Sequence, residues 1–217
     1  MSTTVSSRQL ILERLRVATR DIASDPAIAY SQLPRTYTRA GALSPEERLK
    51  LFIERLCEYD AEVVESSPEA LPDSIAAQLT ASGRLMFVAP SGLPPAWFAL
   101  GFNWITDRGI TYAQMDRSDG VVTAASCGVA DSGTIVLHHA PDQGRRAITL
   151  LPDWHLCIVR ASQIVETLPE YFDRFPQPPA LATYISGPSA TADIEMTRIK
   201  GVHGPRFLHV IVVRDDV

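Results

Sequence analysis

The chain has 217 residues, of which 46% are hydrophobic and 21% are charged, and this composition can build a globular core of ordinary size. The formal net charge of −5 argues against nucleic acid or an anionic membrane surface as the main partner. No apolar stretch approaches the roughly 18 residues that suggest a membrane span, and residues 1–5 lack the apolar core of a signal peptide. We therefore expect a cytoplasmic protein without membrane contact.

The N-terminal part of the chain has helical patterns. Residues 5–22 carry an apolar stripe at helical spacing, and Asp25-Pro26 ends it. Ser44 is followed by Pro45 and two glutamates, which is a typical helix start, and this helix is expected to run to about Tyr59. We predict an N-terminal helical extension over residues 1–60.

Beyond residue 60, short strands alternate with helices, which predicts one α/β domain over residues 61–217. A glycine turn at 131–133 indicates a β-hairpin that would make a mostly parallel sheet mixed. The expected strands are 61–65, 85–89, 103–106, 121–130, 134–138, 156–160 and 207–213, and the expected helices are 68–82, 94–100, 162–175 and 189–199.

The cysteines and histidines give no metal-binding pattern. Cys57, Cys127 and Cys157 are widely spaced, and we expect them to be buried free thiols. His138 and His139 are neighbours on a predicted strand, so their side chains point to opposite faces. We therefore predict no metal site in this chain.

Two segments in the middle of the domain are candidates for ligand binding. The hairpin turn either offers Asp131, Ser132 and Thr134 with backbone amides to a ligand or is simply a tight turn. The Arg145-Arg146 pair after a glycine turn either binds a carboxylate or phosphate with two parallel hydrogen bonds or lies on a solvated or subunit-contact face.

The segment from 185 to 206 combines turn residues, hydroxyls, carboxylates, a histidine and an arginine. Ser189 and Thr191 after Gly187-Pro188 predict a helix start, whose free amides attract anions. His203, between glycines, is either an anchor or proton carrier or part of a plain turn. The candidate ligand-binding residues are Gly133, Thr134, Arg145, Gly187, Ser189, Thr191, Asp193, His203 and Arg206, and the candidate catalytic residues are Asp131, His203 and Glu195.

These segments also carry a family resemblance. The strings CGVADSGTIVL, LLPDWHLCIV and ISGPSATADIEMTRIKGVHGPR resemble the LUD-domain family, in particular its lactate-utilisation protein C group, over most of residues 60–213. The resemblance implies a Rossmann-like three-layer α/β/α fold of the isomerase and CoA-transferase type. It also implies a non-redox part in oxidising L-lactate to pyruvate, with iron–sulfur clusters in partner proteins and no cofactor in this chain.

Three functions remain open at this point. The first is an accessory subunit of a lactate-oxidising system that binds a small carboxylate or other anion in a cleft. The second is a stand-alone enzyme acting on a sugar phosphate or acyl substrate, by analogy with the superfamily. The third is an assembly module without a ligand. The sequence leaves open whether the chain is catalytic by itself and whether it forms a homo-oligomer.

Overall fold

The computed structural model describes residues 6–20, 25–191, 199–201 and 203–215. The chain divides into two compact units, Met1–Tyr37 and Thr38–Val217. The first contains helices α1 (Ser7–Ala18) and α2 (Pro26–Ser31). Helix α1 confirms the expected N-terminal helix, but it buries none of its side chains. No helix in the described part of the chain has the length and hydropathy needed to cross a bilayer.

Helix α3 (Pro45–Glu58) begins where the sequence indicates, with a capping box at its first turn. The Ser44 hydroxyl accepts a hydrogen bond from the Glu47 amide, and the Glu47 carboxylate accepts one from the Ser44 amide at 2.9 Å. Leu49, Phe52 and Leu56 are buried against the sheets of the second unit. The boundary between the units therefore lies before α3, whereas we expected it near residue 60.

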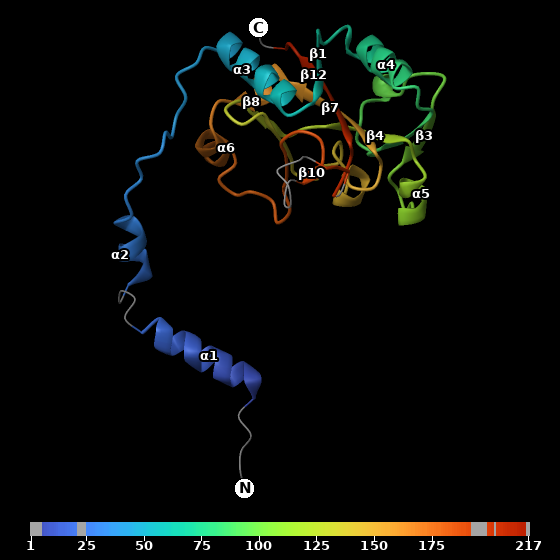
Figure 1. Ribbon diagram of the computed structural model, residues 1–217. Helices are drawn as coiled ribbons and strands as arrows, with labels where there is room; N and C mark the ends of the chain where they lie inside the picture. Colours follow the sequence, from blue (N-terminus) through green and yellow to red (C-terminus); the bar gives the residue numbers. More distant parts are fainter. Residues whose placement is uncertain (1–5, 21–24, 192–198, 202, 216–217) are drawn as a thin grey trace. The chain divides into compact units, whose positions relative to one another are not determined.

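A six-stranded parallel sheet forms the centre of the second unit, and Figure 1 shows β12, β7 and β4 crossing it side by side. Every pairing in this sheet is parallel, so all amino ends of the strands lie at one edge and all carboxyl ends at the other. The spatial order is β1 (Glu62–Ser66), β12 (Phe207–Val213), β7 (Trp154–Arg160), β4 (Gly120–Ala124), β2 (Met86–Ala89) and β3 (Asn103–Thr106).

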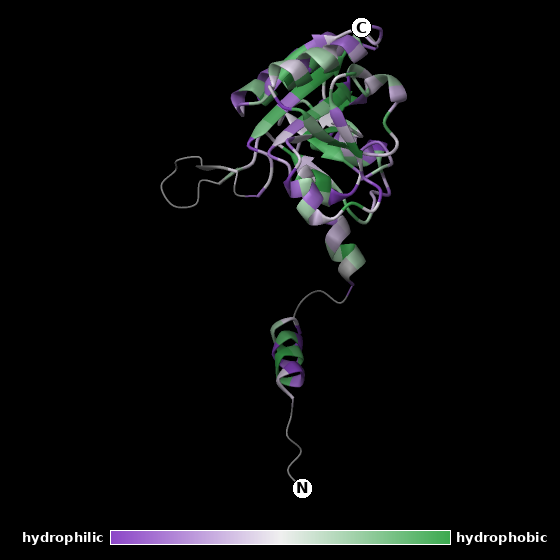
Figure 2. Cartoon of the chain, turned by 90° about the vertical axis from the view of Figure 1, so that its right-hand side faces the viewer, coloured by the Kyte–Doolittle hydropathy of each residue, from purple (hydrophilic) through white to green (hydrophobic). Residues whose placement is uncertain are grey.

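Both faces of the parallel sheet are covered, which confirms the α/β class. Helix α4 (Leu71–Ala81) packs Ile75 and Leu79 on one face, against Leu156 and Ile211. Helix α3 packs on the other face, where Cys157 and Val210 point, because side chains alternate along a strand. Figure 2 shows mostly hydrophobic strands in the centre, whereas the helices beside them contain both hydrophilic and hydrophobic residues. The short elements η1 (Pro95–Trp97), α5 (Tyr112–Asp116) and η2 (Arg146–Thr149) connect the strands.

The predicted hairpin is present, but it belongs to a second sheet. This sheet has the order β8 (Ile164–Val165), β5 (Cys127–Val129), β6 (Thr134–Leu137) and β9 (Thr183–Ile185), and β5 pairs with β6 in antiparallel fashion. The expected strand 121–130 is therefore two strands in two sheets. Its apolar run gives no sign of the break, because both halves are buried.

Two predicted helices are wrong at least in part. Only residues 168–174 of the expected helix 162–175 form a helix, α6 (Leu168–Arg174), which Thr167 caps. No helix starts at Ser189 or Thr191, because β10 (Ala190–Thr191) pairs antiparallel with β11 (Ile199–Lys200). The Gly201 amide donates to the Ser189 carbonyl at 2.8 Å, so cross-strand hydrogen bonds replace those of a helix.

Candidate functional site

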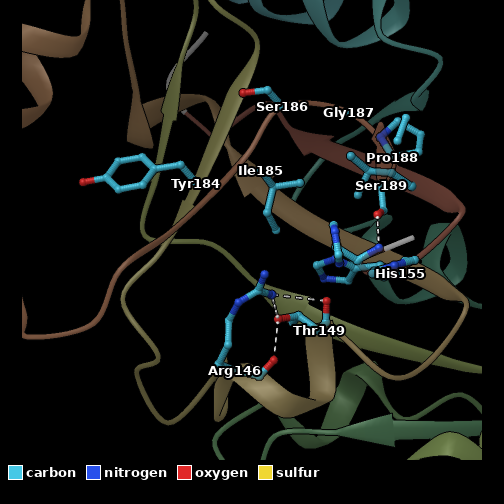
Figure 3. Close-up of a pocket in the computed structure, with 14 residues that line it drawn as sticks. Arg146, Thr149, His155, Tyr184, Ile185, Ser186, Gly187, Pro188 and Ser189 are labelled. Carbon is cyan, nitrogen blue, oxygen red and sulfur yellow. Dashed lines mark hydrogen bonds between the residues drawn. The ribbon is translucent and has the colours of Figure 1, made fainter. Parts of the chain in front are cut away.

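A pocket of about 220 Å³ lies at the amino ends of β7 and β12, and we call it the amino-edge pocket. Its floor includes His155 and Leu208, the second residues of these strands. Its walls come from η2, the end of β9, and the loops before β10 and β12, which Figure 3 shows converging on one cavity. Its polar side chains include Arg146, Thr149, His155, Ser186, Ser189 and His203.

The wall at 186–189 depends on a glycine. Gly187 has a φ of +81°, and a Cβ atom built there would lie 2.6 Å from the Cβ of Tyr59. The neighbouring Ser186 hydroxyl hydrogen-bonds the Thr134 hydroxyl at 2.7 Å, which joins the wall to β6. Glycine is therefore required both for the backbone conformation and for the approach to the end of α3.

We expect Gly187→Ala to lower the free energy of unfolding by about 2–4 kcal/mol, because left-handed strain and a steric clash add together. Gly83→Ala is the matched control, since Gly83 has a φ of +66° and nothing within 4 Å of a built Cβ. The control should lose only about 1–2 kcal/mol. Urea denaturation of both variants tests this, and equal losses would show that the contact with Tyr59 does not matter.

Arg146 supplies the positive charge of the amino-edge pocket. Figure 3 shows its guanidinium pointing up from η2 into the cavity, where Nη1 donates to the Thr149 hydroxyl at 3.0 Å. Burial lowers the pKa of Arg146, but an arginine remains charged. Within the described residues no carboxylate forms an ion pair with it. The pocket thus offers a half-buried cation that pairs with no carboxylate of the described residues.

His155 lies at the floor of the same pocket and is 1% exposed. Its Nε2 atom hydrogen-bonds the Thr123 hydroxyl at 2.8 Å. Burial, and to a smaller extent the nearby Arg146 cation, lower the pKa of His155 to about 3. The imidazole is therefore neutral at physiological pH.

This depressed pKa predicts a pH dependence of stability. Between pH 6.5 and pH 3 the unfolded chain binds a proton at His155 and the folded chain does not, so stability is lost as the pH falls. Each pH unit in this window costs about 1.4 kcal/mol. From pH 7 to pH 5 the wild type should lose about 2 kcal/mol more than His155→Gln. Urea denaturation at both pH values measures the difference, and parallel losses would mean that His155 titrates normally.

Some residues predicted from the sequence line this pocket. Gly187, Ser189 and His203 are among its walls, and the His203 amide donates to the Ser189 hydroxyl at 3.0 Å. Thr134 does not line the pocket, but its hydroxyl forms a hydrogen bond with that of Ser186, which does. Thr191 is in β10, and Asp193 and Glu195 lie outside the described residues.

The hairpin turn does not offer its amides to the pocket. The Asp131 amide donates to the Glu166 carbonyl and the Gly133 amide to the Ala130 carbonyl. A Cβ atom at Gly133 would lie 2.8 Å from Arg55, so this turn packs against α3. The tight-turn interpretation of this segment is the one that the geometry supports.

Two predicted arginines lie elsewhere. Arg206 forms two hydrogen bonds with the Asp153 carboxylate, at 2.6 and 2.8 Å. Arg145 borders a cavity of about 650 Å³ at the carboxyl ends of β2 and β3, the carboxyl-edge pocket, which Arg146 also borders. There Arg145 donates to the buried Asp107 carboxylate at 2.8 Å. Both arginines are thus paired with carboxylates.

Sequence reasoning did not single out Arg146, Thr149 or His155 as ligand-binding residues. Arg146 was noted only as part of the Arg-Arg pair. His155 stands at the start of a predicted strand, where a structural histidine was expected. Of the cysteines, Cys127 and Cys157 are buried as expected, whereas Cys57 is exposed. In the described part of the chain, no three His, Cys, Asp or Glu side chains cluster as they would around a metal ion.

Comparison with known proteins gives consistent matches. The family model described as the LUD domain matches residues 95–213. A Lactate utilization protein C from Deinococcus radiodurans is 39% identical, covering 98% of this chain and 100% of the relative. One from Bacillus subtilis is 34% identical over 58% of this chain and 53% of the relative. The crystal structure of a DUF162 family protein from Deinococcus radiodurans superposes with a TM-score of 0.67 and 37% identity, covering 79% of this chain and 99% of that chain.

Proposed function

This chain belongs to the LUD domain family, and we propose that it is a non-redox subunit of an L-lactate-utilising system that binds a small carboxylate in the amino-edge pocket. A role in lactate utilisation is supported by the relative from Deinococcus radiodurans, which is similar along its whole length and is named for that process. We further propose that the ligand is a carboxylate and that it binds in the amino-edge pocket.

One observation carries the choice of ligand. Arg146 places a cation in the pocket, and no carboxylate of the described residues pairs with it. A half-buried guanidinium gains free energy when it binds a carboxylate, because charge-assisted hydrogen bonds are stronger than neutral ones. The larger carboxyl-edge pocket, which Arg146 also borders, is a weaker candidate for an anion, because the Asp107 carboxylate lines it and pairs with Arg145.

The size of the pocket fits a three-carbon acid. Its volume of about 220 Å³ is below the roughly 300–1,000 Å³ of pockets for drug-sized ligands. Thr149, which accepts a hydrogen bond from Arg146, and Ser186 add hydroxyl groups to the lining of the pocket. Lactate and pyruvate are the acids of this size that the proposed system would handle.

We assign the electron-transfer groups to partner proteins. An iron–sulfur cluster is usually held by four cysteine thiolates, and this chain has three cysteines in all. Cys57 is exposed on α3, whereas Cys127 and Cys157 are buried in different sheets. Their positions fit a subunit that binds and presents a ligand while the partners carry the electrons.

Two measurements test the proposal. Isothermal titration with L-lactate and with pyruvate should give saturable binding at one site per chain. Affinity purification from a cell that grows on lactate should recover iron–sulfur proteins, identified by mass spectrometry and by their visible absorption. If neither acid binds and no iron–sulfur protein is recovered, the proposal is wrong.

A further inference from the structure

We propose that His155 turns an unprotonated Nδ1 atom toward the bound anion, so that the amino-edge pocket prefers a 2-hydroxy acid over the corresponding 2-oxo acid. This inference rests on the proposed function, in which Arg146 binds the carboxylate. It adds the chemical class of ligand that the pocket selects and the residues that impose the choice.

A series of buried hydrogen bonds connects His155 through Thr123 and Cys157 to the backbone. Its Nε2 atom is 2.8 Å from the Thr123 hydroxyl, which is 3.7 Å from the Sγ atom of Cys157. That sulfur is 3.9 Å from the carbonyl oxygen of Ala124. Thr123 and Cys157 are direct neighbours in the pairing of β4 with β7, and His155 is on the same face of the sheet. The three side chains are buried.

The Ala124 carbonyl, at the end of this series of hydrogen bonds, determines which group donates in each of them. A carbonyl oxygen only accepts hydrogen bonds. Burial raises the pKa of the Cys157 thiol to about 12, so its proton stays on and is donated to the Ala124 oxygen. The Thr123 hydroxyl then donates to the sulfur, and its oxygen accepts from an Nε2–H group of His155.

The opposite direction makes fewer hydrogen bonds. If Thr123 donated to Nε2, it could no longer donate to the sulfur, and the one thiol proton could serve either the Thr123 oxygen or the Ala124 carbonyl but not both. Two bonds would then replace three, and buried polar groups are usually satisfied as fully as the geometry permits. The geometry therefore favours the Nε2–H tautomer.

The Nε2–H tautomer leaves a lone pair on Nδ1. Among the described residues, no protein group hydrogen-bonds this atom, although His155 is almost completely buried and borders the pocket. The Arg146 cation borders the same pocket, and a positive charge favours a lone pair over a second N–H group nearby. The pocket thus presents a cation and a hydrogen-bond acceptor.

A 2-hydroxy acid matches these two groups. Its carboxylate pairs with Arg146, and the hydroxyl on the adjacent carbon donates to Nδ1. A 2-oxo acid has only an acceptor at that position, so two acceptors would face each other without a proton. Leaving such a buried acceptor unpaired should weaken binding by about tenfold to a hundredfold.

The tautomer itself is measured by NMR of the protein with labelled histidine. Correlations between ring nitrogens and ring carbon-bound protons should identify Nε2 as the protonated nitrogen of His155 in the free protein. The same sample titrated with L-lactate should show the His155 signals shift. A ring protonated at Nδ1, or at both nitrogens, would overturn the inference.

Isothermal titration of variants tests the consequence. Wild-type protein should bind L-lactate at least about tenfold more tightly than pyruvate. Thr123→Val removes the hydrogen-bond relay without removing side-chain volume, and it should bring the two affinities to within about threefold of each other by allowing the ring to change tautomer. Thr123→Ser keeps the hydroxyl and should retain the preference. Thermal unfolding confirms that both variants are folded.

The titration results distinguish a failure of the role of His155 from a failure of the anion site itself. Equal affinities for the two acids in the wild type, or a preference that survives in Thr123→Val, would contradict the role of His155 and leave the anion site in place. Binding of neither acid would overturn the carboxylate site of the proposed function together with this inference.

Discussion

Replacing Arg146 by glutamine should weaken the binding of L-lactate and of pyruvate at least tenfold. A hydrogen bond to a charged group contributes about 1.5–3 kcal/mol, and each 1.4 kcal/mol is a factor of ten in affinity. Arg146 is the cation that borders the amino-edge pocket without a carboxylate partner among the described residues. Glutamine keeps hydrogen-bonding capacity but has no charge, so the loss measures the electrostatic part. Isothermal titration gives both constants.

The adjacent arginine is the matched control. Arg145→Gln removes the same charge from a residue that is paired with Asp107 and does not line the amino-edge pocket. Its lactate affinity should stay within about threefold of the wild type, because long-range effects of an exposed charge are screened by salt. A large loss in Arg145→Gln with no loss in Arg146→Gln would move the anion site to the carboxyl-edge pocket.

The largest effect on stability is expected for Phe52→Ala, which should lower the free energy of unfolding by about 3–5 kcal/mol. The Phe52 side chain is fully buried between α3 and the strands. Its ring packs against Gly128 of β5, where a built Cβ would lie 2.9 Å from the ring. The substitution leaves a cavity that the surrounding rigid sheets cannot close. Denaturation with urea measures the loss.

Phe172→Ala serves as the control for Phe52→Ala. Phe172 is on α6 and is 45% exposed, so its removal should cost less than half as much. A change of less than about 0.5 kcal/mol in Phe52→Ala would mean that α3 is not part of the folded core. That result would support the predicted boundary near residue 60 instead of the one before α3.

Local patterns predicted most of the parallel sheet. Strands 103–106 and 207–213 occur with the expected bounds, because buried parallel strands are short apolar runs between turn residues. Helix α3 was also predicted, from its capping residues. Its place in the fold was not, because an apolar stripe shows that a helix packs without showing which surface it packs on.

The errors come from contacts between distant parts of the chain. Residues 190–191 pair with 199–200, and local propensity does not report such a pairing. The hairpin at 131–133 leaves the parallel sheet because β6 pairs with β9, about 50 residues later in the chain. In both places the tertiary hydrogen bonds override the local pattern.

The sequence predicted several of the loop residues that line the amino-edge pocket, but it did not predict the cation in it. Gly187, Ser189 and His203 were found because turn residues mark loops, and loops form the walls of pockets. Of the Arg145-Arg146 pair only Arg145 was predicted as a ligand-binding residue, although the local pattern does not distinguish the two. The distinction depends on η2, which begins at Arg146 and turns its side chain into the amino-edge pocket.

A crystal structure of the protein soaked with L-lactate would show whether Arg146 makes the amino-edge pocket an anion site. We predict lactate in this pocket, with a carboxylate oxygen about 3 Å from the Arg146 guanidinium and the hydroxyl facing His155. Lactate bound beside Arg145 in the carboxyl-edge pocket, or an amino-edge pocket that stays free of lactate at saturating concentration, would show that Arg146 does not form the anion site.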